Sequence, residues 1–324
     1  MSSLYVIDAG SSVHHAVSCD CLAHRFGNAG DRPVRARVYP TDLTDAQWGQ
    51  IRLLIPVPGW MGGRGGRPEG FCHREMIDAV LYLVDNGIKW RAMPTDFPAW
   101  DAVYRFFGRW RDGGGLQVLH DRVRRACREE AGRGAEPSAG VIDAQSLRAA
   151  ATVGADRRGF DAAKKVAGTK RHIVTDTLGL LLAVLFTPAG LHDRDGALPL
   201  LTRMRRTCLR ISHLWADGGY AGRLVDCLAE QLRLHLEIVK RTGTAPGFQV
   251  LPRRWVVERT LAWISCCRRC VRDYERRTDT AEAMTFWAML KTMIRRLGLP
   301  AAPLTPGGTT PAPARPASPA APAA

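Results

Sequence analysis

Three acidic residues of this chain have the types and positions that a site for two divalent metal ions requires. Asp143 and Asp217 each end a short apolar run with the pattern of a β-strand. Glu258 lies further along, in an arginine-rich stretch with the pattern of a helix. Mg²⁺ prefers hard oxygen ligands and takes few of them from a protein, so two strand-end carboxylates and a helical one favour two-metal phosphoryl transfer. The surrounding arginines suggest that the phosphate belongs to nucleic acid.

Each acid taken alone has a simpler structural explanation. Asp143 could be a polar residue that leaves a strand, and Asp217 precedes Gly218-Gly219 and could form a turn. Glu258 could pair with Arg254, four residues earlier on the same helical face. The prediction therefore depends on the combination of the three acids on one fold.

Other acids compete for the same role. Asp176 lies in an expected hairpin turn, and Asp193 and Asp195 precede an expected helix. Aspartate is common at such positions because its side chain accepts hydrogen bonds from nearby backbone N–H groups. We expect these three acids to be turn and cap residues.

The elements that would position the acids alternate between strands and helices from about residue 137 onward. Three strands come first, then helix, strand, helix, strand and helix, and an acid ends the first and fourth strands. This order predicts a ribonuclease H-like α/β domain, a mixed five-stranded sheet flanked by helices, with both aspartates at neighbouring strand ends. Strands are expected over 141–142, 171–176, 180–187, 211–216 and 234–240, and helices over 197–206, 222–232, 253–272 and 280–297.

A helical region precedes this sheet, from about residue 40 to 136. A capping-box pattern begins at Thr44, and a second helix is expected to stop at Gly87. A third helix after Pro98 carries Arg105 and Arg109 on one face. Three short helices with a basic third one predict an all-helical, helix-turn-helix-like DNA-binding domain, with a helical bundle bearing solvated arginines as the alternative.

Composition points to a polyanionic partner. The 324-residue chain has a formal net charge of +15 and a pI near 9.9, which favours nucleic acid. The longest apolar run, 178–186, is far shorter than the roughly 20 residues needed to span a bilayer. No secretory signal pattern follows Met1. We expect a soluble protein of the bacterial cytoplasm, associated with the nucleoid and not with a membrane.

The nine cysteines do not suggest a disulfide framework. Their number is odd, which fits reduced thiols. Cys19 and Cys21 have histidines nearby, but the pattern is too loose to predict a metal site. Cys266, Cys267 and Cys270 fall inside an expected helix, where buried thiols are the simpler interpretation. No structural metal is expected.

Four segments follow from these patterns. Residues 1–39 lack periodicity and are expected to form a poorly ordered extension. Residues 40–136 are expected to form the helical DNA-binding domain and residues 137–299 the ribonuclease H-like catalytic domain. Residues 300–324 are almost wholly Pro, Ala, Thr and Gly, which predicts a disordered tail.

Six runs of residues resemble bacterial insertion-sequence DDE transposases of the IS-five group, within the IS-four/IS-five superfamily. The likeness covers about residues 39 to 297. The matching runs are YPTDLTDAQW from residue 39, DFPAW from 96, IDAQS from 142, KRHIVTDTLG from 170, WADGGY from 215 and RWVVERT from 254.

The resemblance implies a function. Asp143, Asp217 and Glu258 would be the catalytic residues and would bind Mg²⁺, with Mn²⁺ as a substitute. The protein would bind the terminal inverted repeats of its element as double-stranded DNA and cleave the element ends by hydrolysis. It would then join the 3′-hydroxyl to target DNA, as a homodimer or larger assembly in the synaptic complex.

Eight cations are candidates for contact with the DNA phosphates. Each could equally be an ordinary solvated charge. They are Arg105, Arg109, Lys164, Lys165, Lys170, Arg171, Arg254 and Arg259.

Two other functions remain open at this point. A ribonuclease H-like nuclease would keep the three acids without recognising element ends. A catalytically inactive DNA-binding derivative would use only the basic helical region. Residues 1–37 lie outside the resemblance, and Val38 stands where such proteins usually begin, so a further hypothesis is that translation starts there.

Overall fold

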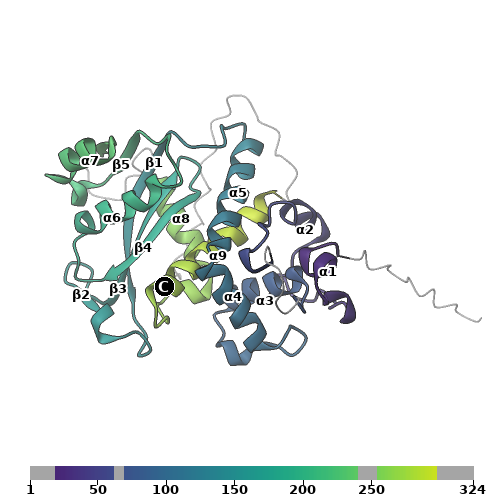
Figure 1. Cartoon of the computed structure of the whole chain (residues 1–324). Helices are drawn as coiled ribbons and strands as arrows, with labels where there is room; N and C mark the ends of the chain where they lie inside the picture. The colour runs from purple at the N-terminus through teal and green to yellow at the C-terminus, as the bar shows by residue number, and fades with distance from the viewer. Residues whose placement is uncertain (1–18, 62–68, 240–253, 298–324) are drawn as a thin grey trace, which may run out of the picture.

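The computed structural model of the chain describes residues 19–61, 69–239 and 254–297. A group of helices lies beside a mixed sheet, and α9 (Thr278–Leu297) packs against both (Figure 1). The expected C-terminal tail lies outside the described residues, as do residues 1–18 of the expected extension.

Six strands in the described part of the chain form one sheet. They are β1 (Ala139–Arg148), β2 (Gly159–Asp161), β3 (Val166–Asp176), β4 (Leu181–Pro188), β5 (His213–Ala216) and β6 (His235–Ile238). β3 pairs antiparallel with β1 on one side and with β2 and β4 on the other, while β5 and β6 continue parallel to β1. The ribonuclease H-like prediction is confirmed, with the short β2 as an extra strand beyond the five that the sequence predicts.

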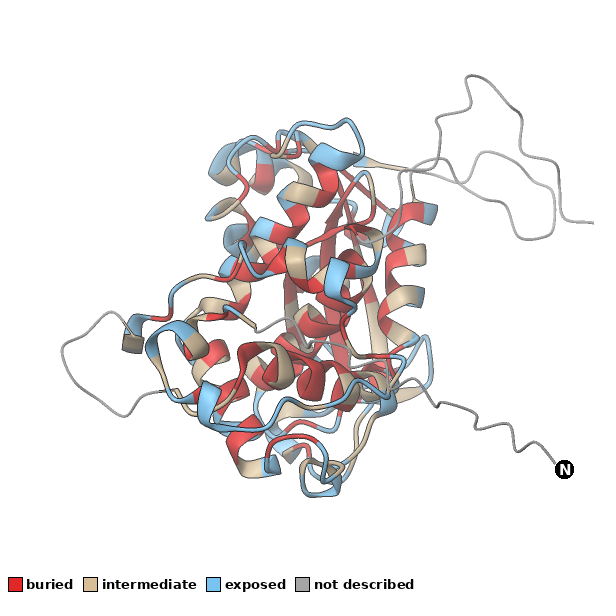
Figure 2. Ribbon diagram, turned by 90° about the vertical axis from the view of Figure 1, so that its right-hand side faces the viewer, coloured by how far each residue is buried: buried red, intermediate tan, exposed pale blue. Residues whose placement is uncertain are grey.

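Helices cover both faces of the sheet because successive strand residues point to opposite sides. Ile142 and Leu214 pack with α6 (Asp193–Arg205) and α7 (Leu224–Leu232). Val141 and Trp215, one residue earlier and one later, belong to the core that includes residues of α8 (Trp255–Ser265) and α9. Figure 2 shows buried residues concentrated where helices and strands face one another.

Helix α8 is shorter than the sequence pattern predicts. The expected helix over 253–272 ends at Ser265 and is followed by the 3₁₀ turn η6 (Arg268–Cys270). Arg269 donates from Nη1 to the carbonyl of Ile88 at 3.0 Å and from Nε to Glu275 at 2.7 Å. The contact with distant Ile88, together with the nearby pair with Glu275, stabilises a turn where the local pattern alone favours more helix.

The α-helices in the expected DNA-binding region, residues 40–136, are α2 (Asp45–Ile51), α3 (His73–Asn86), α4 (Trp100–Asp112) and α5 (Gly115–Glu130). Both hydrogen bonds of the capping box at Thr44 are present, and Gly87 ends α3 with φ +69°. Helix α5 was not predicted from the sequence. Only two residues separate α4 from α5, so the tight turn follows the basic helix α4, whereas in a helix-turn-helix reader the turn precedes the recognition helix. The helical region is confirmed, and its DNA-reading role stays a prediction.

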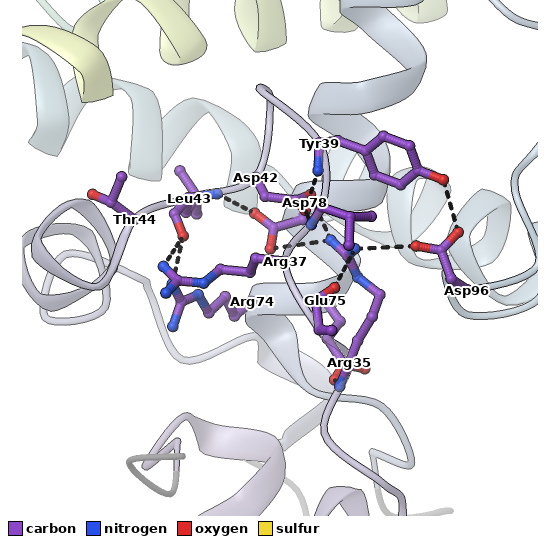
Figure 3. A network of polar contacts seen from close by, with 12 residues as sticks. Arg35, Arg37, Tyr39, Asp42, Leu43, Thr44, Arg74, Glu75, Asp78 and Asp96 are labelled. Atoms are coloured by element: carbon purple, nitrogen blue, oxygen red, sulfur yellow. Dashed lines mark hydrogen bonds and ion pairs between the residues drawn. The ribbon is translucent and has the colours of Figure 1, made fainter. Parts of the chain in front are cut away.

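Residues 19–39 differ from the poorly ordered extension that we expected. They include helix α1 (Leu22–Phe26) and the buried side chain of Arg35. Figure 3 shows this guanidinium among acids of the helical region: it lies 2.5 Å from Asp42 and 3.2 Å from Asp96, and the Arg35 backbone N–H donates to Glu75 at 3.1 Å. Charge pairing, which composition does not show, holds this segment in place.

Helix α9 links the two parts of the molecule. It packs against α5, α3 and α2 of the helical region and against α8 and β4 of the sheet region. Near its end, Arg295 donates to the carbonyl of Pro40 at 3.2 Å. One hydrophobic core therefore extends across the expected boundary near residue 136, and the division into two domains stays a prediction. None of the helices in the described ranges is both long and apolar enough to cross a bilayer.

Candidate active site

The register of the sheet brings Asp143 and Asp217 to neighbouring positions. Val141 of β1 pairs with Trp215 of β5 in a parallel arrangement. Asp143 lies two residues beyond Val141, and Asp217 two residues beyond Trp215. Because strand side chains alternate, both carboxylates continue the face to which Val141 and Trp215 belong, and α8 packs on β1.

Arg254 connects this sheet edge to α8. Its Nη2 atom lies 3.6 Å from Oδ2 of Asp217 and 3.6 Å from Oε1 of Glu258. Glu258 is one helical turn after Arg254, so the simple helical pair considered from the sequence is present. The same guanidinium also reaches the strand-end acid, and it therefore joins two of the three predicted catalytic residues.

Asp143 is in an environment that opposes its charge. Burial raises the pKa of its carboxyl to about 6, and the negative charge of Asp217 acts in the same direction. The backbone N–H of Ala144 donates to Asp143 at 2.7 Å and partly offsets this rise, as do the charges of Arg254 and Lys164. A cation close to Asp143 would favour the ionised carboxylate.

Tyr220 is a residue of this region that sequence reasoning missed. Its side chain is fully buried, and its hydroxyl has no hydrogen-bond partner among the described residues. Burial raises its pKa well above the usual value, and the charges of Asp143, Asp193 and Asp217 add to that effect. The signal available in the sequence was its position three residues after Asp217.

Lys164 and Lys165 are exposed in the connection between β2 and β3. Nζ of Lys164 donates to the carbonyl of Ala144 at 3.3 Å, next to Asp143. Both predicted DNA-contacting lysines are therefore accessible, and Lys164 lies near Asp143.

Lys170 and Arg171 do not suit the DNA contact predicted for them. Lys170 is 5% exposed and lies 2.8 Å from Asp193, and Arg171 is fully buried. Arg171 donates to the carbonyl of Cys270 at 3.1 Å and to Gln145 at 2.5 Å. Their strand, β3, has neighbours on both sides, so these charges are enclosed where the sequence pattern suggested exposed cations.

The other three cations differ in accessibility. Arg105 is exposed and pairs with Asp101 at 3.0 Å. Arg109 is partly exposed and lies 3.2 Å from Glu69. The Arg259 guanidinium lies over the rings of Trp255 and Trp263, 4.2 and 4.5 Å from their centroids, and it donates to the carbonyl of Leu178 at 3.0 Å. Of these, Arg105 extends furthest into solvent.

The competing acids have structural partners. Asp176 is buried, accepts from the backbone N–H groups of Leu178 and Leu180 at 2.9 and 2.8 Å, and pairs with Arg128 at 2.5 Å. Its expected role as a turn residue is confirmed. Asp193 begins α6 and pairs with Lys170, although the helix N-cap is His192.

The donor types at Asp143, Asp217 and Glu258 fit a hard divalent cation. Carboxylate oxygens are the ligands that Mg²⁺ prefers, and the negative charge of Asp217 already raises the pKa of Asp143, so a cation near these two acids would offset their repulsion. In this conformation the Arg254 guanidinium is the cation that joins Asp217 to Glu258. A metal held by all three acids would therefore require Arg254 to move aside.

Comparison with known proteins identifies the family. A family model described as "Transposase DDE domain" matches residues 134–292, and one described as "Putative transposase of IS4/5 family" matches residues 43–120. The chain is 34% identical over 119 residues to a "Putative transposase for insertion sequence element IS402" from Burkholderia cepacia, over 35% of this chain and 56% of that protein. It is 35% identical over 77 residues to the "Uncharacterized protein y4sN" from Sinorhizobium fredii, over 24% of this chain and 58% of that protein.

The matches thus span little more than half the length of these two relatives. Among solved structures, a piggyBac transposase synaptic complex with hairpin DNA aligns with a TM-score of 0.38 and 12% identity, over 78% of this chain and 71% of that chain. The two family models together account for the helical region and the sheet, and the chain belongs to the IS4/IS5 family of DDE transposases.

Proposed function

We propose that this chain is a DNA transposase that binds the terminal inverted repeats of an insertion sequence, cleaves the element ends and joins the resulting 3′-hydroxyl to target DNA. The observation that carries the proposal is that Arg254 lies 3.6 Å from both Asp217 and Glu258, while the charges of Asp217 and Arg254 act on Asp143. Membership of a DDE transposase family supports the same reaction.

The three acids would hold Mg²⁺, for which Mn²⁺ could substitute. Bound there, two such ions supply activation of the attacking oxygen and stabilisation of the leaving 3′ oxygen. Asp143 must lose its proton to act as a ligand, and its raised pKa makes this step dependent on pH.

Arg254 has a separate role in this proposal. It balances the charges of Asp217 and Glu258 in the protein alone. If these acids held metal, the Arg254 guanidinium would be available to pair with a DNA phosphate, a group that arginine binds well through two parallel hydrogen bonds.

DNA would approach along the exposed cations near this edge. Lys164 and Lys165 are accessible, and Arg105 could contact a more distant phosphate. The net charge of +15 supports binding to double-stranded DNA that weakens with added salt. A synaptic complex that pairs two element ends would use two or more copies of the chain. Such a protein would act in the bacterial cytoplasm, associated with the nucleoid.

The Asp143→Asn variant tests the proposal. We expect it to lose cleavage of DNA that carries the element ends in Mg²⁺ by at least about 10²-fold, the scale of removing one charge-stabilising group from a phosphoryl-transfer or acyl-transfer site. Its affinity for the same DNA in a mobility-shift assay should stay within a factor of a few. Asp195→Asn, a change of the same chemistry at an exposed acid, is the matched control and should cleave normally.

The outcomes separate the three candidate functions. Cleavage that persists in Asp143→Asn would refute the assigned site. Cleavage without strand joining, and without preference for the inverted repeats that flank the gene, would indicate a ribonuclease H-like nuclease. DNA binding by the unmodified protein with neither cleavage nor joining would indicate an inactive DNA-binding derivative.

A further inference from the structure

Four side chains outside the acidic site bring soft metal ligands together. Cys19, Cys21, His24 and Cys72 each offer one ligand atom, and these atoms all lie within 4.8 Å of one another. Cys21 and Cys72 are buried, while Cys19 and His24 are partly exposed. Cys72 comes from a segment about fifty residues away from the other three, so the group forms only in the folded chain.

The spacing of the atoms matches the edges of a tetrahedron around zinc. With Zn–S near 2.3 Å and Zn–N near 2.0–2.1 Å, tetrahedral ligands lie about 3.8 Å apart for two sulfurs and about 3.6 Å apart for sulfur and nitrogen. Here Sγ of Cys72 is 3.7 Å from Sγ of Cys19 and 4.0 Å from Sγ of Cys21, and Nδ1 of His24 is 3.2 Å from Sγ of Cys21.

A disulfide does not account for this geometry. Bonded sulfurs lie about 2.05 Å apart, well below the distances from Cys72 to Cys19 and Cys21. A disulfide between two of these cysteines would also leave the third thiol and the His24 imidazole facing it without a role. Three thiols and one imidazole form one of the usual closed ligand sets of structural zinc.

Two helix starts hold the ligands in place. Cys21 is the N-cap of α1, and its carbonyl accepts from the backbone N–H groups of His24 and Arg25 at 2.9 and 3.0 Å. Cys72 is the N-cap of α3. The backbone N–H of His73 donates to Sγ of Cys21 at 3.4 Å, a contact that stabilises a thiolate and supports the ligand from outside.

We propose that Cys19, Cys21, His24 and Cys72 form a structural zinc site that fastens residues 19–28 to the start of α3. On binding, Zn²⁺ displaces one proton from each of the three thiols and coordinates three thiolates and a neutral imidazole. All four positions are then filled by the protein, so the ion has a structural and not a catalytic role. The site is separate from the acids at residues 143, 217 and 258.

The attachment would complement contacts that already join these segments. The backbone N–H of Asn28 donates to the carbonyl of Glu69 at 2.9 Å, and Arg35 pairs with acids of the helical region further along. A short helix of five residues has little stability of its own, so a metal link is a physically reasonable way to fix α1 against the larger α3.

Metal analysis of the full-length protein, purified under reducing conditions without chelators, tests the inference. We expect about one zinc per chain, and Cys72→Ser should lower this content to near zero. Cys266→Ser changes an exposed cysteine outside the group and should retain the metal. Asp143→Asn should also retain it, which separates this site from the proposed catalytic one.

Cobalt substitution of the unmodified chain gives a readout that needs no variant. Co²⁺ added to the chain after removal of zinc should produce the thiolate charge-transfer and visible bands of a tetrahedral site. His24→Cys should still bind and shift these bands, because it exchanges one soft ligand for another. Less than a tenth of an equivalent of zinc in the unmodified chain, equal loss in Cys266→Ser, or a disulfide at Cys72 in peptide mapping would each overturn the proposal.

Discussion

At the scale of single residues, the acidic site depends on balanced charge. Asp143 is partly buried and its raised pKa opposes ionisation, while Asp217 and Glu258 share the guanidinium of Arg254. A carboxyl group whose pKa is raised by folding destabilises the fold when it is ionised, which gives stability a predictable dependence on pH.

The pKa of Asp143 predicts the sign of that dependence. Its folded value, about 6, lies above its ordinary value of 3.8, so folding takes up a proton between these values. The contribution of Asp143 to stability should therefore rise as the pH falls from about 7 towards 4 and be least favourable above pH 6. In magnesium-free buffer at pH 7.5, Asp143→Asn should increase the free energy of unfolding by about 1–2 kcal/mol.

Denaturant unfolding at pH 5 and pH 7.5 measures this effect. The difference between Asp143→Asn and the unmodified chain should shrink at pH 5, where the folded carboxyl already carries its proton. Added Mg²⁺ should stabilise the unmodified chain more at pH 7.5 than at pH 5, because the metal needs the ionised carboxylate. A difference of the same size at both pH values would contradict the assigned burial of this acid.

At the scale of helices and strands, element ends fix the positions of the functional groups. Gly87 ends α3 with φ +69°, and a Cβ atom there would lie 2.9 Å from Cβ of Arg268 in η6. This glycine therefore meets two requirements, a left-handed backbone and close contact with a turn of the C-terminal region.

Alanine substitutions at two glycines should have opposite effects. Gly87→Ala should lower the free energy of unfolding by about 1–3 kcal/mol, since it adds both backbone strain and a steric clash. Gly49→Ala, inside α2 with open space around the position, should raise it by about 0.5–1 kcal/mol through helix propensity. Chemical denaturation measures the free energy of unfolding of both variants. If the two substitutions changed it by the same amount, the described packing of Gly87 against η6 would be contradicted.

The helices and strands also show which structural features could be predicted from the sequence and which could not. The capping box at Thr44, the stop at Gly87 and the strand-end acids were predictable because each depends on near neighbours or on the register of one sheet. The burial of Arg171 and the approach of Cys72 to Cys19 were not, because they depend on segments far apart in the chain. Helix α5 was missed although Leu116, Leu119 and Val123 have helical spacing.

At the scale of the whole molecule, α9 makes the helical and sheet regions one structure. Trp287 on this helix is fully buried in the core that contains both Phe106 of α4 and Val141 of β1. A continuous core of this kind favours cooperative unfolding over independent unfolding of two domains.

Trp287→Ala should therefore destabilise the entire chain. We expect a single unfolding transition, detected alike by circular dichroism and fluorescence, with a free energy lowered by about 3–5 kcal/mol. Trp255→Ala, at a tryptophan that is 41% exposed, should change it by no more than about 1 kcal/mol. Two separate transitions, of which the variant shifts only one, would show that the regions unfold independently.

The packing of α9 also has a consequence for how the protein is made. Domains that emerge early from the ribosome generally fold while synthesis continues. Here, helices α2, α3 and α5 have apolar surface that α9 covers, and α9 is made more than one hundred and forty residues after α5. Part of the core of the nascent helical region is therefore exposed to solvent until α9 leaves the ribosome, and during this period chaperones or premature DNA contacts can act on it.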